Sequence, residues 1–408
     1  MNYPLSGLKV LDLSRVLAGP VCTQLLADLG ADVVKVERPG SGDDTRQWGP
    51  PFVPQDGPSG YFVSCNRGKR SLALDLAHPS SGEVIDDLIR CADVLVENFL
   101  PDSLVRLGLE PARLSQLNSA LVTCSISGYG RNGPLAAMPG YDLMMQASAG
   151  IMSITGEPDG RPMKVGVAIT DVITGLYAAA CVLAGLYARG KVGSGISFDL
   201  ALADCTLASL VNVAQGALLT GETPRRWGNA HPQIVPYEAF ATADGHLVLA
   251  VGADRQWQRF CKAIARDDLA ADERFATNPA RVEHREQLIP ELQRIFAERT
   301  TAVWQTLLTA VEVPHSPVVA LNEVLESPQV AAREMVSHVM DVAGRRYRML
   351  GSAIHWIHEP ARQARAAPEL GQHSAEVLGD WLKYDQKRIA QLQHVGAIAC
   401  PASSAPTD

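Results

Sequence analysis

Three features are missing from this sequence, and each absence excludes a class of protein. The eight cysteines form no Cys-x-x-Cys pair and have no clustered histidines, so we expect no metal site, no disulfide scaffold and a reducing, cytoplasmic compartment. The 36 Lys and Arg are outnumbered by 44 Asp and Glu, and this net charge of −8 argues against nucleic-acid binding. The longest apolar run, residues 176–188, is shorter than the roughly 18 residues of a membrane span, and no signal peptide is recognised at the start, so no membrane contact is expected.

The composition is that of an ordinary globular protein. Apolar residues make up 47% and charged residues 20% of the 408 positions, which argues against disorder and low-complexity scaffolds. A chain of this length holds two or three domains at the usual roughly 100 to 200 residues per domain. A large buried core is therefore expected.

The first hundred residues alternate between strand and helix periodicity. Residues 9–14 and 32–38 read as strands, and the helix between them is predicted over 21–29, with Pro20 at its start and Gly30 at its end. A right-handed crossover makes such strands parallel neighbours and brings the loops that follow them to the carboxyl edge of the sheet, where ligands bind. The pattern predicts an α/β fold with a mostly parallel sheet.

Further elements extend this sheet to at least five strands. We predict a helix over 80–91, strands over 93–99, 120–127 and 196–201, and a short strand over 166–169 that leads into a long helix over 172–189. From about residue 219 the composition shifts to Gly, Pro, Arg and His, and the strand at 246–251 is followed by charged helices. These predict a smaller α+β domain.

A glycine motif at residues 128–133, Gly-Tyr-Gly-Arg-Asn-Gly, follows a predicted strand. The dinucleotide fingerprint needs a helix to open at its third glycine, and Pro134 with Pro139 makes a poor helix start, so a glycine loop is the better interpretation.

Asp171 lies between the predicted strand at 166–169 and the long helix. Its commonest role there would be an N-cap that accepts hydrogen bonds from the first helical amides. The same place suits a nucleophilic carboxylate, because the helix N-terminus keeps the group ionised and the loop leaves it at the ligand-binding edge. Position alone leaves both alternatives open.

Cationic residues gather on or near the predicted carboxyl-edge loops although the chain as a whole is acidic. They are Arg15, Arg38, Arg46, Lys69, Arg70 and Arg106. Arginine binds phosphates and carboxylates through paired hydrogen bonds, so this concentration predicts an anionic ligand.

Several motifs together make the chain resemble the class III CoA-transferases, the CaiB/BaiF family. They are RVLAGP at 15–20, KVERPGSGDDTR at 35–46, NRGKRS at 66–71, VENF at 96–99, GYG at 128–130, GYD at 140–142, the Asp171 segment, RWGNAHP at 226–232 and PELGQH at 368–373. The resemblance covers nearly the whole chain.

The resemblance implies an interlocked homodimer with a Rossmann-like large domain made from both ends of the chain and a small α+β domain between them. The expected boundaries are 1–205 for the first part of the large domain, 206–235 for a linker, 236–318 for the small domain, 319–395 for the returning segment and 396–408 for a flexible tail. It also implies that Asp171 is the nucleophile. The residues it implies for the CoA site are Val16, Arg38, Leu74, Asn98, Phe99 and Arg106, with Arg38 and Arg106 at the adenosine-phosphate end.

Chemistry of this kind needs no cofactor beyond CoA itself as co-substrate. A carboxylate attacks the donor thioester to give a mixed anhydride, and the returning thiolate makes an aspartyl-CoA thioester, so neither ATP nor a metal is required. The protein must exclude water from both intermediates.

Among the transferases, the sequence looks most like the branch that uses succinyl-CoA with glutarate, itaconate or similar short dicarboxylates. The substrate residues we expect are Arg46, Trp48, Tyr141 and His231, of which Arg46 or His231 could hold the second carboxylate. The alternative is an isomerase, because the α-methylacyl-CoA racemases, which the sequence also resembles, share the same fold. That branch has a His-Asp pair where this chain has Tyr141-Asp142, and Tyr141 is a poor proton shuttle near neutrality.

Overall fold

The structure is a computed structural model that describes residues 3–357 and 364–400. The chain divides into two compact units. Unit 1 comprises residues 1–151, 165–215 and 328–408, and unit 2 comprises residues 152–164 and 216–327. Part of the tail expected at 396–408, residues 401–408, lies outside the described residues.

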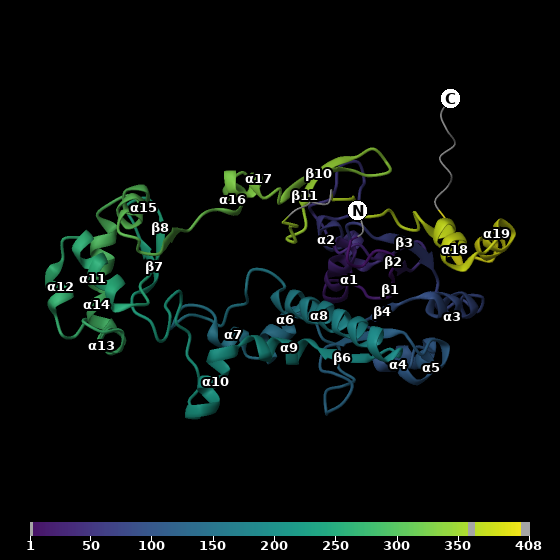
Figure 1. Ribbon diagram of the computed structural model, residues 1–408, viewed down its shortest axis with the longest axis horizontal. Coiled ribbons are helices and arrows are strands. Elements are labelled where there is room, and N and C mark those ends of the chain that lie inside the picture. Colours follow the sequence, from purple (N-terminus) through teal and green to yellow (C-terminus); the bar gives the residue numbers. More distant parts are fainter. Residues whose placement is uncertain (1–2, 358–363, 401–408) are drawn as a thin grey trace. The chain divides into compact units, whose positions relative to one another are not determined.

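Unit 1 is built on a seven-stranded sheet in the order β12-β3-β2-β1-β4-β5-β6 (Figure 1). These strands are β1 (Lys9–Asp12), β2 (Asp32–Glu37), β3 (Arg70–Leu74), β4 (Val94–Glu97), β5 (Val122–Ser127), β6 (Ser197–Ala201) and β12 (Ile398–Ala399). Six strands are parallel, with β1 between β2 and β4, and β12 pairs antiparallel with β3 at the edge. The predicted parallel sheet is confirmed, and its strand order reverses between β1 and β4.

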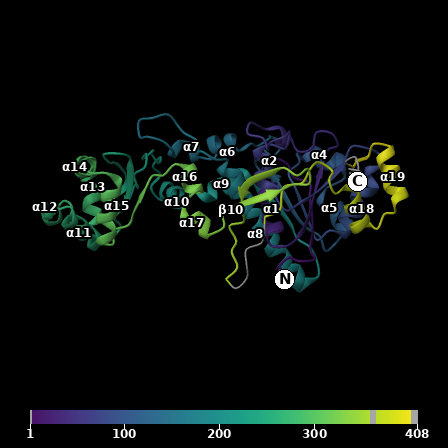
Figure 2. The same ribbon diagram turned by 90° about the horizontal axis from the view of Figure 1, so that it is seen from above.

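Helices cover both faces of this sheet because its strands alternate their side chains between two cores. Val10 of β1 packs into a core with α1 (Ala18–Asp28) and α8 (Ile169–Val192), whereas Leu11 packs into the opposite core with α3 (Ser81–Cys91) and α18 (Ser374–Leu382). Figures 1 and 2 both show α18 and α19 (Gln386–His394), from the C-terminal part, beside the N-terminal part of the unit.

The remaining elements of unit 1 connect and flank these layers. They are η1 (Asp44–Gln47), α2 (Gly60–Cys65), α4 (Pro101–Leu107), α5 (Pro111–Leu117), α6 (Asp142–Ser148), α7 (Ile151–Ile154), α9 (Leu202–Ser209), α10 (Val211–Thr220), α17 (Pro328–Ala332) and the antiparallel pair β10 (Val336–Met340) and β11 (Arg346–Leu350). Helices α7 and α10 continue across the boundary with unit 2.

Helix α8 packs tightly against α1 and β5. A side chain in place of Gly175 would put its Cβ 2.6 Å from the carbonyl oxygen of Ala18, so the two helices can approach this closely only with glycine there. Of the single helices in residues 3–357 and 364–400, only α8 is long and apolar enough to cross a membrane, a property that interior helices of soluble proteins share.

Unit 2 is an α+β unit with its own core. Its antiparallel sheet of β7 (Tyr237–Ala241), β8 (His246–Ala250) and β9 (His315–Pro317) is covered by helices α11 (Asp254–Ala263), α12 (Asp267–Ala271), α13 (Asn278–Glu283), α14 (Arg285–Ala297) and α15 (Thr301–Ala310), and α16 (Leu321–Leu325) follows. Phe240 and Phe296 stack with ring centroids 4.7 Å apart in its centre.

Two predictions about local structure were wrong. Residues 166–169 do not form a strand, because a short apolar run does not distinguish a strand from the start of a buried helix, and α8 already begins at Ile169. Lys69 and Arg70 do not lie at the carboxyl edge, since they precede and begin β3 at its amino end. The Lys69 side chain is buried against Asp12, and that of Arg70 pairs with Asp32.

Candidate active site

Two adjoining cavities lie at the carboxyl edge of the sheet, between the loops that follow β1 and β4. They share the lining residues Arg15, Asp44, Phe99 and Ser103. Asn98 ties the two loops together, since its side chain accepts a hydrogen bond from the Arg15 amide at 2.9 Å and donates one to the Arg15 carbonyl at 2.8 Å. Doubly wound sheets bind their ligands at this point of strand reversal.

The first cavity is lined by Arg38, Leu74 and Arg106 besides the shared residues. Arg38 and Arg106 are exposed, and Arg106 donates to the Ser103 hydroxyl at 3.1 Å. Leu74 is buried at the end of β3. Two accessible guanidinium groups beside an apolar wall suit the anionic end of an elongated ligand.

The second cavity is lined by Val16, Asn98, Tyr141 and Asp171, with Phe99 at its junction with the first. The structure therefore brings together all six residues predicted for CoA around two joined cavities, and it places the predicted nucleophile in one of them. Tyr141 is 59% exposed and lies beside this cavity.

Asp171 occupies the first turn of α8 and is only 8% exposed. Burial, together with the nearby Asp142 carboxylate, raises the pKa of Asp171 to about 7. Across the described parts of the chain, no hydrogen bond to its carboxylate oxygens is found. A buried carboxylate without a partner is poorly stabilised in its charged form and is available to react with a bound ligand.

The N-cap interpretation of Asp171 was wrong, because the first turn is capped by a residue from another helix. Asp142, at the start of α6, accepts hydrogen bonds from the Thr170 amide at 2.8 Å and the Thr170 hydroxyl at 2.7 Å. Gln146 donates to its other oxygen at 2.6 Å. Sequence reasoning missed this role of Asp142, although the residue stands in the quoted Gly140-Tyr141-Asp142 motif.

Two glycines fix the loop that carries Tyr141 and Asp142. A Cβ built on Gly128 would lie 2.7 Å from the Gly140 Cα, and one built on Gly140 would lie 2.3 Å from the Gly128 Cα. The two backbones thus cross at a distance that only glycine allows. The motif at 128–133 acts as a packing loop, and no helix opens at Gly133.

The expected substrate residues are placed in different environments. The guanidinium of Arg46 donates to both oxygens of buried Glu37, at 2.7 and 2.8 Å, and lies over the Phe62 ring. Trp48 is 44% exposed and packs its ring edge-on to Tyr61. His231 belongs to unit 2, where its ring packs on Tyr237. The roles of Arg46, Trp48, Tyr141 and His231 stay predictions.

The fold and cavities together define an α/β protein of the doubly wound class with two adjoining cavities at its sheet edge, one of which contains a buried carboxylate without a cationic partner. The profile of CoA-transferase family III matches residues 5–374, and the chain belongs to this family. It is therefore an enzyme of the class III CoA-transferase type.

Similar proteins of known activity cover almost the full chain. A succinate–glutarate CoA-transferase of Agrobacterium fabrum is 45% identical over 92% of this chain and 95% of its own length. A human succinyl-CoA:glutarate CoA-transferase is 39% identical over 97% and 90%, and a succinyl-CoA:mesaconate CoA-transferase of Haloarcula hispanica is 40% identical over 92% and 96%. A crystal structure of a CaiB/BaiF family protein from Brucella suis matches with a TM-score of 0.82 at 40% identity, over 93% of this chain and 100% of the other.

Proposed function

We propose that this enzyme moves CoA from succinyl-CoA to a short dicarboxylic acid, glutarate or an itaconate-like acid, with Asp171 as the nucleophile. The observation that carries the proposal is the unpartnered Asp171 carboxylate in one of the two adjoining cavities that the six expected CoA residues line. The relatives that act on glutarate support the choice of acceptor.

The expected reaction begins when an Asp171 oxygen attacks the thioester carbon of succinyl-CoA. The C–S bond breaks, and CoA leaves as a thiolate from a succinyl-aspartyl anhydride. The thiolate then attacks the aspartyl carbonyl carbon, which releases succinate and leaves an aspartyl-CoA thioester. The acceptor carboxylate repeats both steps in the opposite order, so that its acyl group leaves as the new thioester and Asp171 is regenerated.

The surroundings of Asp171 suit this sequence of steps. Its low exposure limits the access of water to the anhydride and thioester, both of which hydrolyse. A pKa of about 7 leaves a useful fraction of the carboxylate ionised at neutral pH, while weak solvation of the charged form keeps it nucleophilic. No step requires ATP, a metal or a redox cofactor.

The distal carboxylate of the acceptor needs a cationic or amide-rich partner. Arg46 is a candidate, but its guanidinium is already held by Glu37, so binding there would require it to leave that pair. His231 is the other candidate. If Arg46→Ala leaves the KM for glutarate unchanged in a folded protein, Arg46 has no such role.

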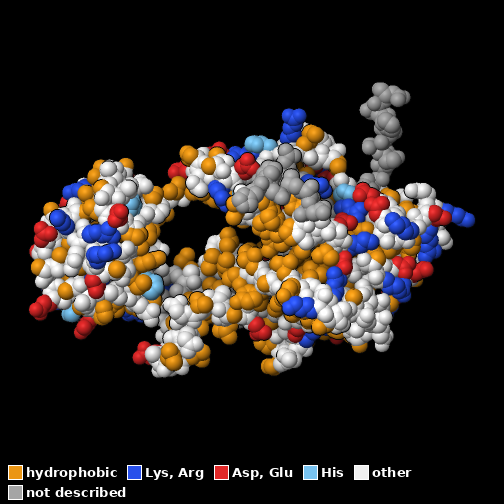
Figure 3. All heavy atoms as spheres, viewed as in Figure 1, with side chains coloured by type: hydrophobic (Ala, Val, Ile, Leu, Met, Phe, Trp, Pro, Cys, Tyr) orange, Lys and Arg blue, Asp and Glu red, His pale blue; other side chains and the backbone are white. Residues whose placement is uncertain are grey.

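A homodimer is part of the proposal. Figure 3 shows hydrophobic side chains gathered over α6, α8 and α9 of unit 1. The exposed large apolar residues on these helices are Leu143, Met144, Leu176, Tyr177, Tyr187, Val192 and Leu207. An apolar patch of this kind is typical of a surface covered by another chain, and sedimentation of the purified enzyme tests whether that chain is a second copy.

The direct test is mass spectrometry of the purified enzyme with succinyl-CoA, without ATP or metal, against glutarate, itaconate, mesaconate, malate, citramalate, oxalate and carnitine. A new dicarboxylyl-CoA with matching release of succinate would support transfer and name the acceptor. If none forms, and deuterium from heavy water instead enters a 2-methylacyl-CoA, the racemase alternative replaces the proposal.

The nucleophile can be tested separately with an isotope. Because the acceptor's attacking oxygen remains on the aspartyl group when the anhydride is cleaved, ¹⁸O-labelled glutarate should leave ¹⁸O in the peptide that contains Asp171. Transfer without ¹⁸O in that peptide would remove Asp171 as the nucleophile and leave the overall reaction standing.

A further inference from the structure

Val16 holds an unusual backbone at the cavity that contains Asp171. Its φ is 71°, in the left-handed region that a β-branched residue rarely adopts. Such a conformation persists only where the surrounding structure imposes it, and it is concentrated at functional sites. The question is therefore which groups hold Val16 in place.

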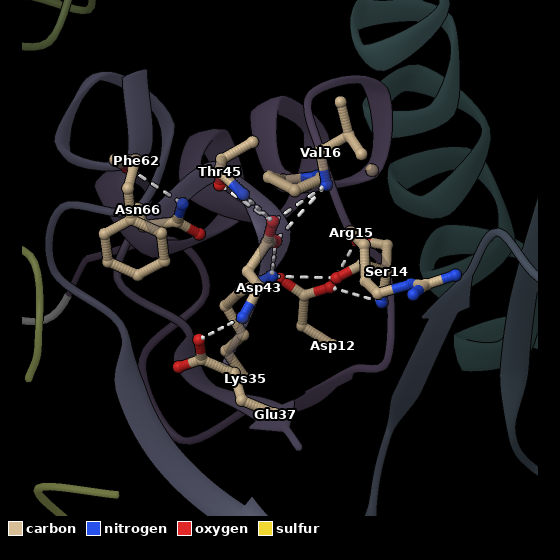
Figure 4. Close-up of polar contacts among 12 residues, drawn as sticks. Asp12, Ser14, Arg15, Val16, Lys35, Glu37, Asp43, Thr45, Phe62 and Asn66 are labelled. Carbon is tan, nitrogen blue, oxygen red and sulfur yellow. Dashed lines mark hydrogen bonds and ion pairs between the residues drawn. The ribbon is translucent and has the colours of Figure 1, made fainter. Parts of the chain in front are cut away.

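Side chains from β2 and from the loops that follow β2 and β4 fix residues 14–16. The Val16 amide donates to both oxygens of Asp43, at 3.2 and 3.4 Å. The ammonium group of Lys35 donates to the Ser14 carbonyl at 2.8 Å, and Asn98 holds the Arg15 backbone from the far side. Figure 4 shows Asp43 lying between Val16 and Lys35.

Lys35 and Asp43 also bind each other. Their charged atoms are 2.8 Å apart, and both side chains are fully buried. Burial alone would lower the pKa of Lys35, but Asp43, Asp12 and Glu37 raise it above its ordinary range. Burial likewise raises the pKa of Asp43, and Lys35 with the Thr45 hydrogen bonds lowers it below its ordinary range. Both groups therefore stay charged, and each one fixes the other.

We propose that the buried Lys35–Asp43 pair is a positioning device for the acyl-CoA substrate. Through Asp43 it holds the Val16 amide, and through Lys35 it holds the Ser14 carbonyl, so the wall of the cavity keeps a conformation that Val16 would not adopt unaided. This inference rests on the proposed binding of acyl-CoA in that cavity. Lys35 and Asp43 border the first cavity but not the one that contains Asp171, and they act on that second cavity through Val16.

The test compares one substitution in two backgrounds. Asp43→Ala removes the acceptor of the Val16 amide, and we expect about a tenfold weaker Kd for CoA, measured by titration calorimetry. Glycine adopts a positive φ without strain, so Val16→Gly should make the cavity wall less dependent on Asp43. In the Val16→Gly background, the added loss from Asp43→Ala should fall below about threefold. An equal loss in both backgrounds would show a merely structural role and overturn the inference.

Asp43→Ala leaves the Lys35 ammonium group buried beside a vacancy, and the single variant can therefore fail to fold. The same comparison is then made with Lys35→Met added to both backgrounds, which removes the unpaired charge. Because Asp43 still holds Val16 in the Lys35→Met variant, the background dependence should persist there. Tight CoA binding by Lys35→Met/Asp43→Ala, equal to that of the unmodified enzyme, would overturn the inference.

A matched control is available at the opposite end of α1. Arg67 and Asp28 form another largely buried ion pair in unit 1, away from both cavities. Asp28→Ala should lower the melting temperature and leave the Kd for CoA unchanged. If the unmodified enzyme binds no CoA, the proposed function and this inference fall together. If it binds CoA and Asp43→Ala binds equally well, only this inference falls.

Discussion

Two aspartates in unit 1 are buried to nearly the same degree and have opposite properties. Asp12 is fully buried, and although burial alone would raise its pKa, Lys69, Lys35 and two hydroxyl groups lower it to about 2. Asp171 is 8% exposed, has no cationic partner, and its pKa rises to about 7 because of burial and Asp142. Burial therefore sets the need for a partner, and the presence of a cationic partner decides whether the pKa of a buried carboxylate falls or rises.

The comparison has opposite consequences for stability. The folded-state pKa of Asp171 lies above the unfolded value of about 3.9, so its contribution is fully present below that value and is lost as the pH rises through 7. The folded-state pKa of Asp12 lies below the unfolded value, so its contribution is present above about pH 4 and is lost as the pH falls toward 2. At neutral pH, Asp12 therefore stabilises the fold, whereas Asp171 destabilises it.

The largest expected effect is on catalysis. Asp171→Asn should reduce CoA transfer by about 10³-fold or more, since an amide cannot form the anhydride. Asp204→Asn is a matched control, because Asp204 also lies in the first turn of a helix but is exposed. Steady-state assays with succinyl-CoA and the identified acceptor measure both. Transfer by Asp171→Asn at more than a tenth of the normal rate would contradict the assignment.

The second effect is on the structural carboxylate. Asp12→Asn should lower the free energy of unfolding by about 3 kcal/mol at pH 7, because it leaves buried Lys69 without its counter-charge. Urea denaturation measures the change. Adding Lys69→Met should recover part of the loss. A neutral outcome for Asp12→Asn would mean that partners contribute less here than the pKa implies.

The third effect has the opposite sign. Asp171→Asn should raise the free energy of unfolding by about 1 to 3 kcal/mol at pH 8, where the unmodified carboxylate is charged and unpartnered. At pH 4 most of the gain should be gone, because Asp171 is then protonated in the folded protein and about half protonated in the unfolded chain. Thermal or urea unfolding at both pH values gives the comparison. A gain that is independent of pH would point to packing and not to charge.

The pH dependence of the reaction sharpens the same point. kcat/KM should rise with pH along a limb centred near pH 7, as Asp171 ionises. Asp142→Asn removes the second cause of the raised pKa, so it should move the limb to lower pH while an amide oxygen can still cap α8. A limb that stays in place would show that burial alone sets this pKa.

The smallest expected effect concerns the first cavity, which Arg38 and Arg106 line. Arg38→Ala and Arg106→Ala should each raise the KM for succinyl-CoA about tenfold with little change in kcat, because they line the cavity that does not contain Asp171, where we expect the unreactive phosphate end of CoA. Dephospho-CoA, which lacks one phosphate, offers the control: its affinity should fall less in these variants than that of CoA. An equal loss of affinity for CoA and dephospho-CoA would show that the two arginines do not bind the phosphate that dephospho-CoA lacks.

The sequence alone settled the layout of the sheet edge. Alternating periodicities with Pro20 and Gly30 as helix signals were enough to place β1, α1 and β2, and parallel pairing of β1 with β2 is confirmed. The combination of motifs also identified the family and predicted residues that line the two cavities. These properties are readable because they depend on local periodicity and on short segments whose ends a parallel sheet must bring together.

Only the tertiary structure decided which charges are free. The sequence suggested Lys69 and Arg46 as cations for an anionic ligand, and in the fold Lys69 pairs with Asp12 and Arg46 with Glu37. From the sequence, Asp171 could equally be a helix cap or a nucleophile. In the structure Asp142, 29 residues earlier, caps the helix. Pairing between distant residues depends on packing and not on sequence spacing, and here packing left the buried Asp171 carboxylate without a cationic partner.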